Sequence, residues 1–479
     1  MESLNNTTWD IVLSGTGLPN SLLALALSRS GKKVLHHDEH EFYGGSEAAL
    51  SLEEAEVWVE RINHEATRSP FQQASITKLE EYVSAVPRLS FSRAYNLCLA
   101  PQIIYSRTNL LPALVASKVY KQLEFLAVGN WFIFDPGVND SFSLGGSVQQ
   151  NALEPASRPC LRRIPNGREG IVKDKTIDFA NKRSLTQLLL MIKDDESRKQ
   201  AIAENKTLPF TYFLTAQYQL DRRLQAPFHA LTLSPNAPED TTTEYALTRL
   251  HRHLSSMGAY GPGFCAVIPR WGGLAEIAQV GCRAGAVGGG VYVLNKGIGG
   301  FPDSTAPPNH PDQNDKFLAL GLTLEETIYT RRAVGSKYDY PSATTRPDPN
   351  PEDPPKIAVR SIAIVTSSLP EMFPPAKAAV HNPAAVMVIF PTGSLSLPDT
   401  TISPSSDESP TSETPPTSDV PLPSPPPPAP RNPVPIYLQV RSAETGECPR
   451  DQSKLPLFLP SHNLALSNDD TIRILIYIA

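Results

Sequence analysis

The sequence predicts an α/β protein of the α+β multidomain type, with a large domain that starts as a parallel sheet and a small all-helical domain. The first observation is a strand, turn, helix and strand order over residues 10–36. The second is helical spacing in the middle of the chain, at 177–192, 210–220 and 243–257. With 479 residues, 40% of them hydrophobic, the chain is long enough for two cores.

The N-terminal segment has the pattern of a Rossmann-type βαβ unit. Residues 10–13 form a short apolar run, and a Gly-Thr-Gly turn follows at 15–17. Helical spacing covers 18–29, and a second strand is predicted at 33–36. Two strands joined by a helix run parallel, so the sequence predicts a parallel sheet covered by helices.

Periodicity predicts the remaining elements. Residues 52–126 show mostly helical spacing. Short apolar runs rich in β-branched and aromatic residues predict strands at 131–134, 290–294, 357–366, 384–390 and 435–440. We expect the strands at 357–366 and 384–390 to pair with each other.

Proline is concentrated in two tracts. Of the 47 prolines, 6 lie in residues 341–355 and 14 in residues 398–435. Segments of this composition bury too little apolar surface to offset the entropy lost on ordering. We expect both tracts to be disordered insertions. A plain loop insertion is favoured over a ligand for an SH3-type domain.

Charge and cysteine usage argue against several classes of protein. The net charge is −6 and no block of five basic residues occurs, which argues against nucleic acid or anionic lipid as the main partner. Five widely spaced cysteines without a CxxC pair argue against a disulfide framework and a structural zinc site. The first ten residues lack the apolar core of a signal peptide, and no apolar run approaches the ~18 residues of a membrane span. The sequence predicts a cytosolic protein.

The turn after the first strand is a degenerate dinucleotide fingerprint, made by Gly15, Gly17 and, after the second strand, Asp38. Asn20 replaces the third glycine, and Pro19 removes a backbone N–H donor from the helix start that would face a pyrophosphate. A retained fold without cofactor is favoured over cofactor binding, in which Asp38 would hold a ribose.

The sequence contains no recognisable catalytic or metal-binding motif. GxSxG, HExxH and P-loop patterns are absent. His36 and His37 are adjacent, so on a strand their side chains face opposite sides, and we expect structural histidines. We therefore predict neither a catalytic residue nor a metal site.

Several segments taken together resemble the Rab GDP-dissociation inhibitor and Rab escort protein superfamily. Residues 9–19 and 28–36, followed by Tyr43-Gly44-Gly45, are similar to its N-terminal signature. The likeness continues through 95–125, 164–191, 210–233 and 260–296. Leu18-Pro19, 28–31 and Tyr105-Ser106-Arg107 are more similar to the escort branch than to the inhibitors.

The resemblance implies a discontinuous large domain shaped like a flavoprotein monooxygenase, over 1–105 and 235–479, and a small helical domain over 106–234. In this superfamily the large domain generally holds no flavin, so we expect no cofactor. Residues 454–479 show no likeness to the superfamily. We expect the large domain to be less stable than in a relative that continues into the closing strands and helix.

The resemblance also implies two binding surfaces. Taken by themselves, Glu276 and Arg283 lie seven residues apart on one face of a helix, which is equally typical of a solvated face. Five residues match the platform that grips the switch regions of a Rab GTPase: Tyr43, Glu276, Arg283, Val291 and Val293. Phe210 and Arg222 match the helix pair through which escort proteins contact the transferase.

The implied function is that of a non-catalytic accessory component. An escort protein binds GDP-bound Rab GTPases, presents their C-terminal cysteines to the α/β heterodimer of Rab geranylgeranyltransferase, shields the geranylgeranyl lipid and delivers the product in transient contact with a membrane. No nucleic acid is expected. Three alternatives stay open: an inhibitor that recycles prenylated Rab without the transferase, an FAD-dependent oxidoreductase, and a scaffold that acts through its proline tracts.

Overall fold

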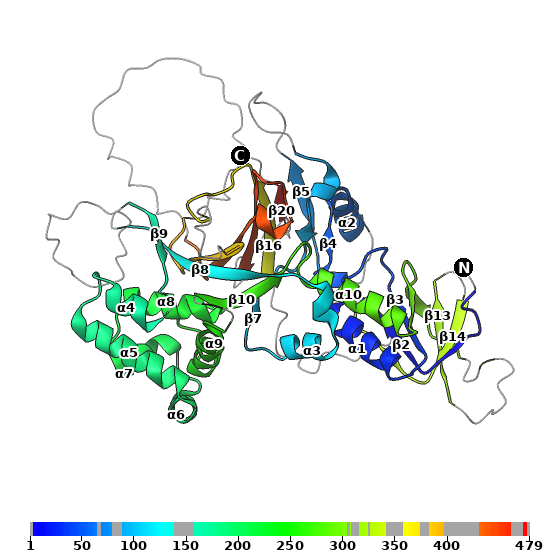
Figure 1. Cartoon of the computed structure of the whole chain (residues 1–479), viewed down its shortest axis with the longest axis horizontal. Helices are drawn as coiled ribbons and strands as arrows, with labels where there is room; N and C mark the ends of the chain where they lie inside the picture. The colour runs from blue at the N-terminus through cyan, green and yellow to red at the C-terminus, as the bar shows by residue number, and fades with distance from the viewer. Residues whose placement is uncertain are drawn as a thin grey trace, which may run out of the picture.

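A computed structural model of the chain describes residues 3–64, 69–78, 89–137, 158–165, 167–259, 261, 263–303, 307, 316–323, 326–341, 358–373, 383–396, 431–460 and 473–476. Both proline tracts lie almost wholly outside these ranges, and so does the prediction that they are disordered. Figure 1 shows a group of helices on one side, a large sheet in the middle and a smaller parallel sheet with its helices on the other side.

The predicted βαβ start is confirmed. Strands β2 (Ile11–Ser14) and β3 (Val34–His37) pair in parallel and are joined by helix α1 (Leu18–Arg29). Strands β11 (Val291–Val293) and β15 (Ala333–Val334) extend this sheet in parallel on its two sides. Helix α10 (Leu274–Val287) packs beside α1 (Figure 1) and leads directly into β11. Sequence-distant segments thus complete the sheet that residues 11–37 begin.

A second, four-stranded sheet packs against the parallel one. It has the order β1-β14-β13-β12, formed by β1 (Thr8–Trp9), β14 (Glu326–Thr330), β13 (Leu318–Leu322) and β12 (Ile298–Gly300). The core between the two sheets includes Trp9, Val12, Leu35 and Leu320. Val293 of β11 belongs to this core, so the second sheet holds β11 in place.

The large sheet has eight strands, and seven of them follow the order β16-β19-β18-β17-β8-β10-β7. Their bounds are β16 (Ala358–Val365), β19 (Ser453–Pro460), β18 (Ile436–Ser442), β17 (Ala385–Phe390), β8 (Phe125–Asp135), β10 (Phe264–Pro269) and β7 (Ile104–Tyr105), and β9 (Cys160–Arg163) pairs with β8. The predicted pairing of the strands at 357–366 and 384–390 is wrong, because β19 and β18 lie between β16 and β17.

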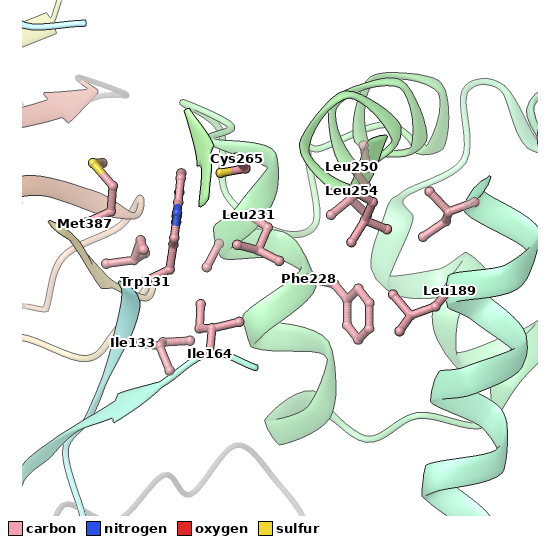
Figure 2. Close-up of a cluster of buried hydrophobic side chains, with 14 of the residues drawn as sticks. Trp131, Ile133, Ile164, Leu189, Phe228, Leu231, Leu250, Leu254, Cys265 and Met387 are labelled. Atoms are coloured by element: carbon pink, nitrogen blue, oxygen red, sulfur yellow. The ribbon is translucent and has the colours of Figure 1, made fainter. Parts of the chain in front are cut away.

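Six helices form the helical region: α4 (Arg168–Lys173), α5 (Phe179–Lys193), α6 (Asp195–Asn205), α7 (Phe210–Tyr218), α8 (Arg222–Thr232) and α9 (Thr243–Ser256). Four of their N-termini are capped by a side-chain oxygen, from Asp178, Asp194, Asp221 and Thr242. The helices bury their apolar faces in one core that continues onto β8, where Trp131 and Ile133 face Ile164 and Leu231 (Figure 2).

Two expectations about the first half of the chain need correction. Residues 52–126 are not mostly helical: the described part holds α2 (Leu52–His64) and α3 (Leu110–Ala116), with strands β5 (Ser75–Lys78), β6 (Leu97–Cys98) and β7 between them. The helical region also differs in its bounds from the predicted 106–234. β8 lies inside that range but belongs to the large sheet, and α9 lies beyond it but packs with the other helices. β5, β6 and β7 are only two to four residues long, which is too short for a period-2 pattern to be recognised.

The chain beyond residue 452 contributes strands to two sheets. β19 pairs along its whole length with β16, and β20 (Arg473–Ile476) pairs with β5. β4 (Ala49–Leu50) pairs with β6 nearby. No helix in the described ranges combines the length and apolar character needed to cross a bilayer.

A fully buried ion triad ties β18 to β19. Arg441 Nη1 lies 2.5 Å from Glu447 Oε1, and Lys454 Nζ lies 2.7 Å from Glu447 Oε2, with all three side chains 0% exposed. Lys454 Nζ also donates to the carbonyl of Asn96 at 2.6 Å. Burial raises the pKa of Glu447, but the charges of Arg441 and Lys454 outweigh it and hold that pKa below its usual range. The carboxylate therefore neutralises one of two buried cations.

We predict that Glu447→Gln destabilises the protein by about 3–5 kcal/mol, because it leaves two cations buried without a counter-charge. Urea unfolding at pH 7 measures this loss. The difference from the unsubstituted protein should shrink as the pH falls from the unfolded pKa of glutamate towards the lower folded pKa of Glu447, because the unfolded chain protonates first. Glu444→Gln, an exposed change in the same turn, is the matched control. Equal stability of both variants would contradict the prediction.

Candidate functional site

The start of helix α1 is occupied by a carboxylate of the chain itself. Gly15 adopts φ +83°, which turns the chain from β2 towards the helix. The backbone N–H of Leu18, at the first helical position, donates to Glu47 Oε2 at 2.8 Å. In dinucleotide-binding proteins a phosphate accepts such N–H groups. Glu47 therefore fills the anion position that the fold provides.

Asp38 is already fully engaged. Its Oδ2 accepts from the backbone N–H and the hydroxyl of Thr16, both at 2.6 Å, and its Oδ1 accepts from His40 N at 2.9 Å and His40 Nδ1 at 2.8 Å. Burial raises the pKa of Asp38, but its hydrogen bonds to His40 and Thr16 prevail and lower it. The carboxylate holds the turn together and has no oxygen free for a ribose.

A third acidic side chain, Asp339, packs against Gly15 of the turn. Its Oδ1 lies 2.5 Å from the point that a Cβ on Gly15 would take, and its Oδ2 accepts from Ser336 N at 2.5 Å. Burial raises the pKa of Asp339 to about 6. A cavity of about 460 Å³ borders the turn and is lined by Asp38, Glu47 and Asp339. Glu39 is also in the wall, so a pyrophosphate placed there would face four carboxylates, and these residues do not fit a dinucleotide.

The two adjacent histidines are structural, as predicted. His36 Nε2 donates to Gly15 O at 2.9 Å, and His37 Nδ1 donates to Lys296 O at 2.7 Å. Burial lowers the pKa of His36 to about 4. Across the ranges that the structure describes, no group of three or more His, Cys, Asp or Glu side chains is placed to hold a metal ion.

Three predicted platform residues lie close together beside this turn. Tyr43 follows β3, and Glu276 and Arg283 lie two turns apart on α10. Burial raises the pKa values of Tyr43 and Glu276, and the nearby charge of Arg283 opposes both shifts. Tyr43 and Glu276 are half-buried, whereas Arg283 is exposed. The surface thus offers a phenol, a carboxylate and a guanidinium to a partner.

The two predicted valines differ in their surroundings. Val291 is 38% exposed at the start of β11. Val293 is 8% exposed and packs in the core with Trp9 and Leu320, so its side chain is not on the surface. The alternation of a strand places these two residues on the same side, but the second sheet covers only the later one.

Of the two predicted transferase contacts, one is buried and the other is exposed. Phe210 is 0% exposed and stacks on Phe213, with ring centroids 6.2 Å apart, so it belongs to the helical core and not to a surface. Arg222 is exposed at the first position of α8. It lines a cavity of about 820 Å³ together with Tyr212, which is 59% exposed on α7. Tyr212 was missed because the periodicity of α7 does not distinguish a buried aromatic from an exposed one.

A small apolar pocket lies inside the helical region. It has a volume of about 70 Å³ and lies between α4, α5, α8 and α9. Its wall includes Leu189, Phe228, Leu250 and Leu254, which face one another in Figure 2. Pro227, also in the wall, lies inside α8 and removes one backbone hydrogen bond from it. The four helices therefore surround an apolar pocket, and one of them, α8, lacks a backbone hydrogen bond beside it.

Comparison with known proteins identifies the family. The sequence pattern of the family described as GDP dissociation inhibitor matches residues 5–302, which is more than half of the chain. The chain belongs to this family. It is 30% identical over 295 residues to the Rab proteins geranylgeranyltransferase component A of Candida albicans, a match that covers 61% of this chain and 42% of that protein.

Solved structures share the fold. The crystal structure of a Rab GDI from Plasmodium falciparum superimposes with a TM-score of 0.59 at 16% identity, covering 96% of this chain and 84% of that one. An oxidoreductase from Methanosarcina mazei superimposes with a TM-score of 0.50 at 9% identity, covering 96% and 80%. The chain spans about half the length of the curated relatives it matches.

We predict that Asp339→Asn raises stability at pH 8 by about 1–3 kcal/mol and leaves it unchanged near pH 4. An unfolded aspartate ionises near pH 3.8, whereas folded Asp339 ionises near pH 6, so the folded state loses stability as the pH rises between these values. Thermal unfolding at a series of pH values measures this. Asp303→Asn, an exposed change, is the control. A variant that is no more stable at pH 8 would contradict the prediction.

Proposed function

We propose that this chain acts as a Rab escort protein. It binds Rab GTPases in the GDP state, presents them to the Rab geranylgeranyltransferase heterodimer and shields the attached lipid, without catalysing the transfer itself. The observation that carries the proposal is the clustering of Tyr43, Glu276 and Arg283 on one surface of a chain that belongs to the GDP dissociation inhibitor family.

The chemistry of this surface suits a protein partner. Arginine and tyrosine are the residue types that most often dominate protein interfaces, because they combine a broad contact area with hydrogen-bond donors. Arg283 is exposed and free to reach outward, while half-buried Glu276 keeps an acceptor beside it. Val291 adds an apolar contact at the neighbouring strand. The GTPase would contact these four residues together.

The lipid would enter the apolar pocket of the helical region. Each buried methylene contributes about 0.8 kcal/mol, so a twenty-carbon chain strongly favours an apolar site over water. The pocket of about 70 Å³ is far smaller than the roughly 300 Å³ at which ligand sites begin. Binding therefore requires the helices to separate. We infer that α8 moves, because Pro227 weakens it beside the pocket.

The transferase would bind at the cavity between α7 and α8. Exposed Tyr212 and Arg222 are the anchors, with Arg222 placed to pair with an acidic side chain. This surface lies on different elements from the GTPase platform, which is formed by α10 and β11. One chain could then hold both partners at once, as presentation of a substrate requires.

For the platform, we predict that Arg283→Ala weakens binding of a GDP-loaded Rab GTPase at least tenfold, because it removes a central interface cation. Calorimetry or surface plasmon resonance with the purified full chain measures this. Arg93→Ala, an exposed arginine on the large domain, should leave the affinity unchanged. If the unsubstituted chain does not bind GDP-loaded Rab, the proposal is wrong.

For the transferase surface, we predict that Tyr212→Ala combined with Arg222→Ala reduces the stimulation of Rab prenylation at least tenfold. The same variant should still bind GDP-loaded Rab. The assay follows transfer of a labelled geranylgeranyl group by added transferase. Arg223→Ala, an exposed neighbour that does not line the cavity, is the control. An unsubstituted chain that binds Rab but gives no stimulation would instead be a recycling inhibitor.

A further inference from the structure

We propose that the turn between α4 and α5 is a docking surface for membranes that contain anionic lipids. This surface, named here the α4–α5 face, consists of Val172, Lys173, Lys175, Phe179 and Arg183. It joins exposed apolar side chains to a local excess of positive charge. The membrane contact would serve the proposed function, since an escort protein delivers prenylated Rab to a membrane. The binding of vesicles itself can be tested without a GTPase.

The apolar part of the face is unusually exposed. Phe179, the first residue of α5, is 85% exposed, and Val172, near the end of α4, is 56% exposed. The two helix ends are held together, because Lys182 Nζ donates to the carbonyl of Val172 at 3.0 Å. A single exposed apolar side chain is common on a protein surface, but Phe179 and Val172 lie on two helix ends joined by this hydrogen bond and next to several cations.

The charged part of the face comes from a segment rich in lysine and arginine. Residues 158–183 contain eight Lys and Arg against three Asp and Glu, in a chain whose net charge is −6. No continuous basic block marks this segment in the sequence, because the cations are spaced over three structural elements. Lys173, Lys175 and Arg183 are all exposed, and within the described part of the chain they form no ion pair.

The nearby carboxylates do not cancel this charge. Asp178 caps α5 by accepting from Asn181 N at 2.8 Å, and Asp174 accepts from Thr176 N at 2.8 Å. Arg162 is neutralised separately by Asp135 at 3.0 Å. Both acids keep their charges, so residues 173–183 hold four cations against two carboxylates, which leaves a net charge of +2. The turn therefore still attracts an anionic surface.

The α4–α5 face is continuous with the apolar pocket. Ile171 and Ile177, from the same helix end and turn, face inward and line the pocket. Val172 and Phe179, each one or two residues away, face outward. A bilayer bound at the turn would thus be separated from the pocket by a single layer of chain. This arrangement favours a lipid surface over an acidic protein, because it gives an acyl or prenyl chain a short path between the two.

Basic side chains near an anionic bilayer are attracted to its surface charge, and a shallowly inserted aromatic side chain adds apolar burial. Three cations and one phenylalanine therefore support weak, reversible binding that salt reduces. Neutral bilayers should bind far less. Such binding would let the protein visit a membrane without remaining there.

The test uses the full chain with no GTPase present. Sedimentation is measured with phosphatidylcholine vesicles and with vesicles that contain about one-third phosphatidylserine. We expect binding to the anionic vesicles only, and Lys173→Ala combined with Lys175→Ala should weaken it about tenfold or more. Phe179→Ala should weaken it severalfold at low and at high salt. Lys32→Ala combined with Lys121→Ala, and Phe91→Ala, are exposed controls that should bind normally.

Two results would overturn the inference: no binding of the unsubstituted chain to anionic vesicles, or an equal loss in the control variants. Thermal unfolding verifies that each variant is folded. Binding of GDP-loaded Rab is measured on the same preparations. A chain that binds Rab but not vesicles refutes the α4–α5 face alone, whereas a chain that binds vesicles but not Rab refutes the proposed function alone.

Discussion

The carboxylate of Glu447 is the charge on which the assembly of the large domain depends. It neutralises Arg441 of β18 and Lys454 of β19, and its backbone carbonyl accepts from Asn96 N at 3.1 Å. Two residues before Glu447, the backbone carbonyl of Thr445 accepts a hydrogen bond from Trp271 N at 2.9 Å. Trp271 directly precedes the turn into α10, the helix that holds Glu276 and Arg283. The segment that holds the buried Glu447 is thus bonded, through Thr445, to the residue before the turn into α10.

Internal carboxylates also close the glycine turn at the start of the βαβ unit. The βαβ unit retains its glycine turn and helix start, which in other proteins attract phosphate. Here Glu47 caps the helix, Asp38 holds the turn and Asp339 covers it. The fold keeps its geometry because these acids supply from within the hydrogen bonds that a cofactor would supply. The surface beside the turn carries Tyr43, Glu276 and Arg283.

Local patterns predicted the elements whose signal is local. The strand, turn and helix over residues 10–37 follow from an apolar run, two glycines and a helical period, and the structure has them where they were predicted. Failures occurred where the outcome depends on distant neighbours. β16 and β17 were predicted as a pair, but segments from the end of the chain insert between them. Phe210 and Val293 were predicted at surfaces, but other elements cover them.

By itself, the sequence determined the fold class, the order of most helices and strands, the degenerate state of the nucleotide turn and the resemblance that pointed to the family, because each depends on residue type and short spacing. Only the tertiary structure decided which side chains reach the surface, that Asp339 closes a turn more than 300 residues away, and that Phe179 is exposed whereas Ile171 and Ile177 line a pocket. The reason is physical: burial and electrostatic environment are set by what packs against a residue, and contacts of this range leave no periodic trace along the chain.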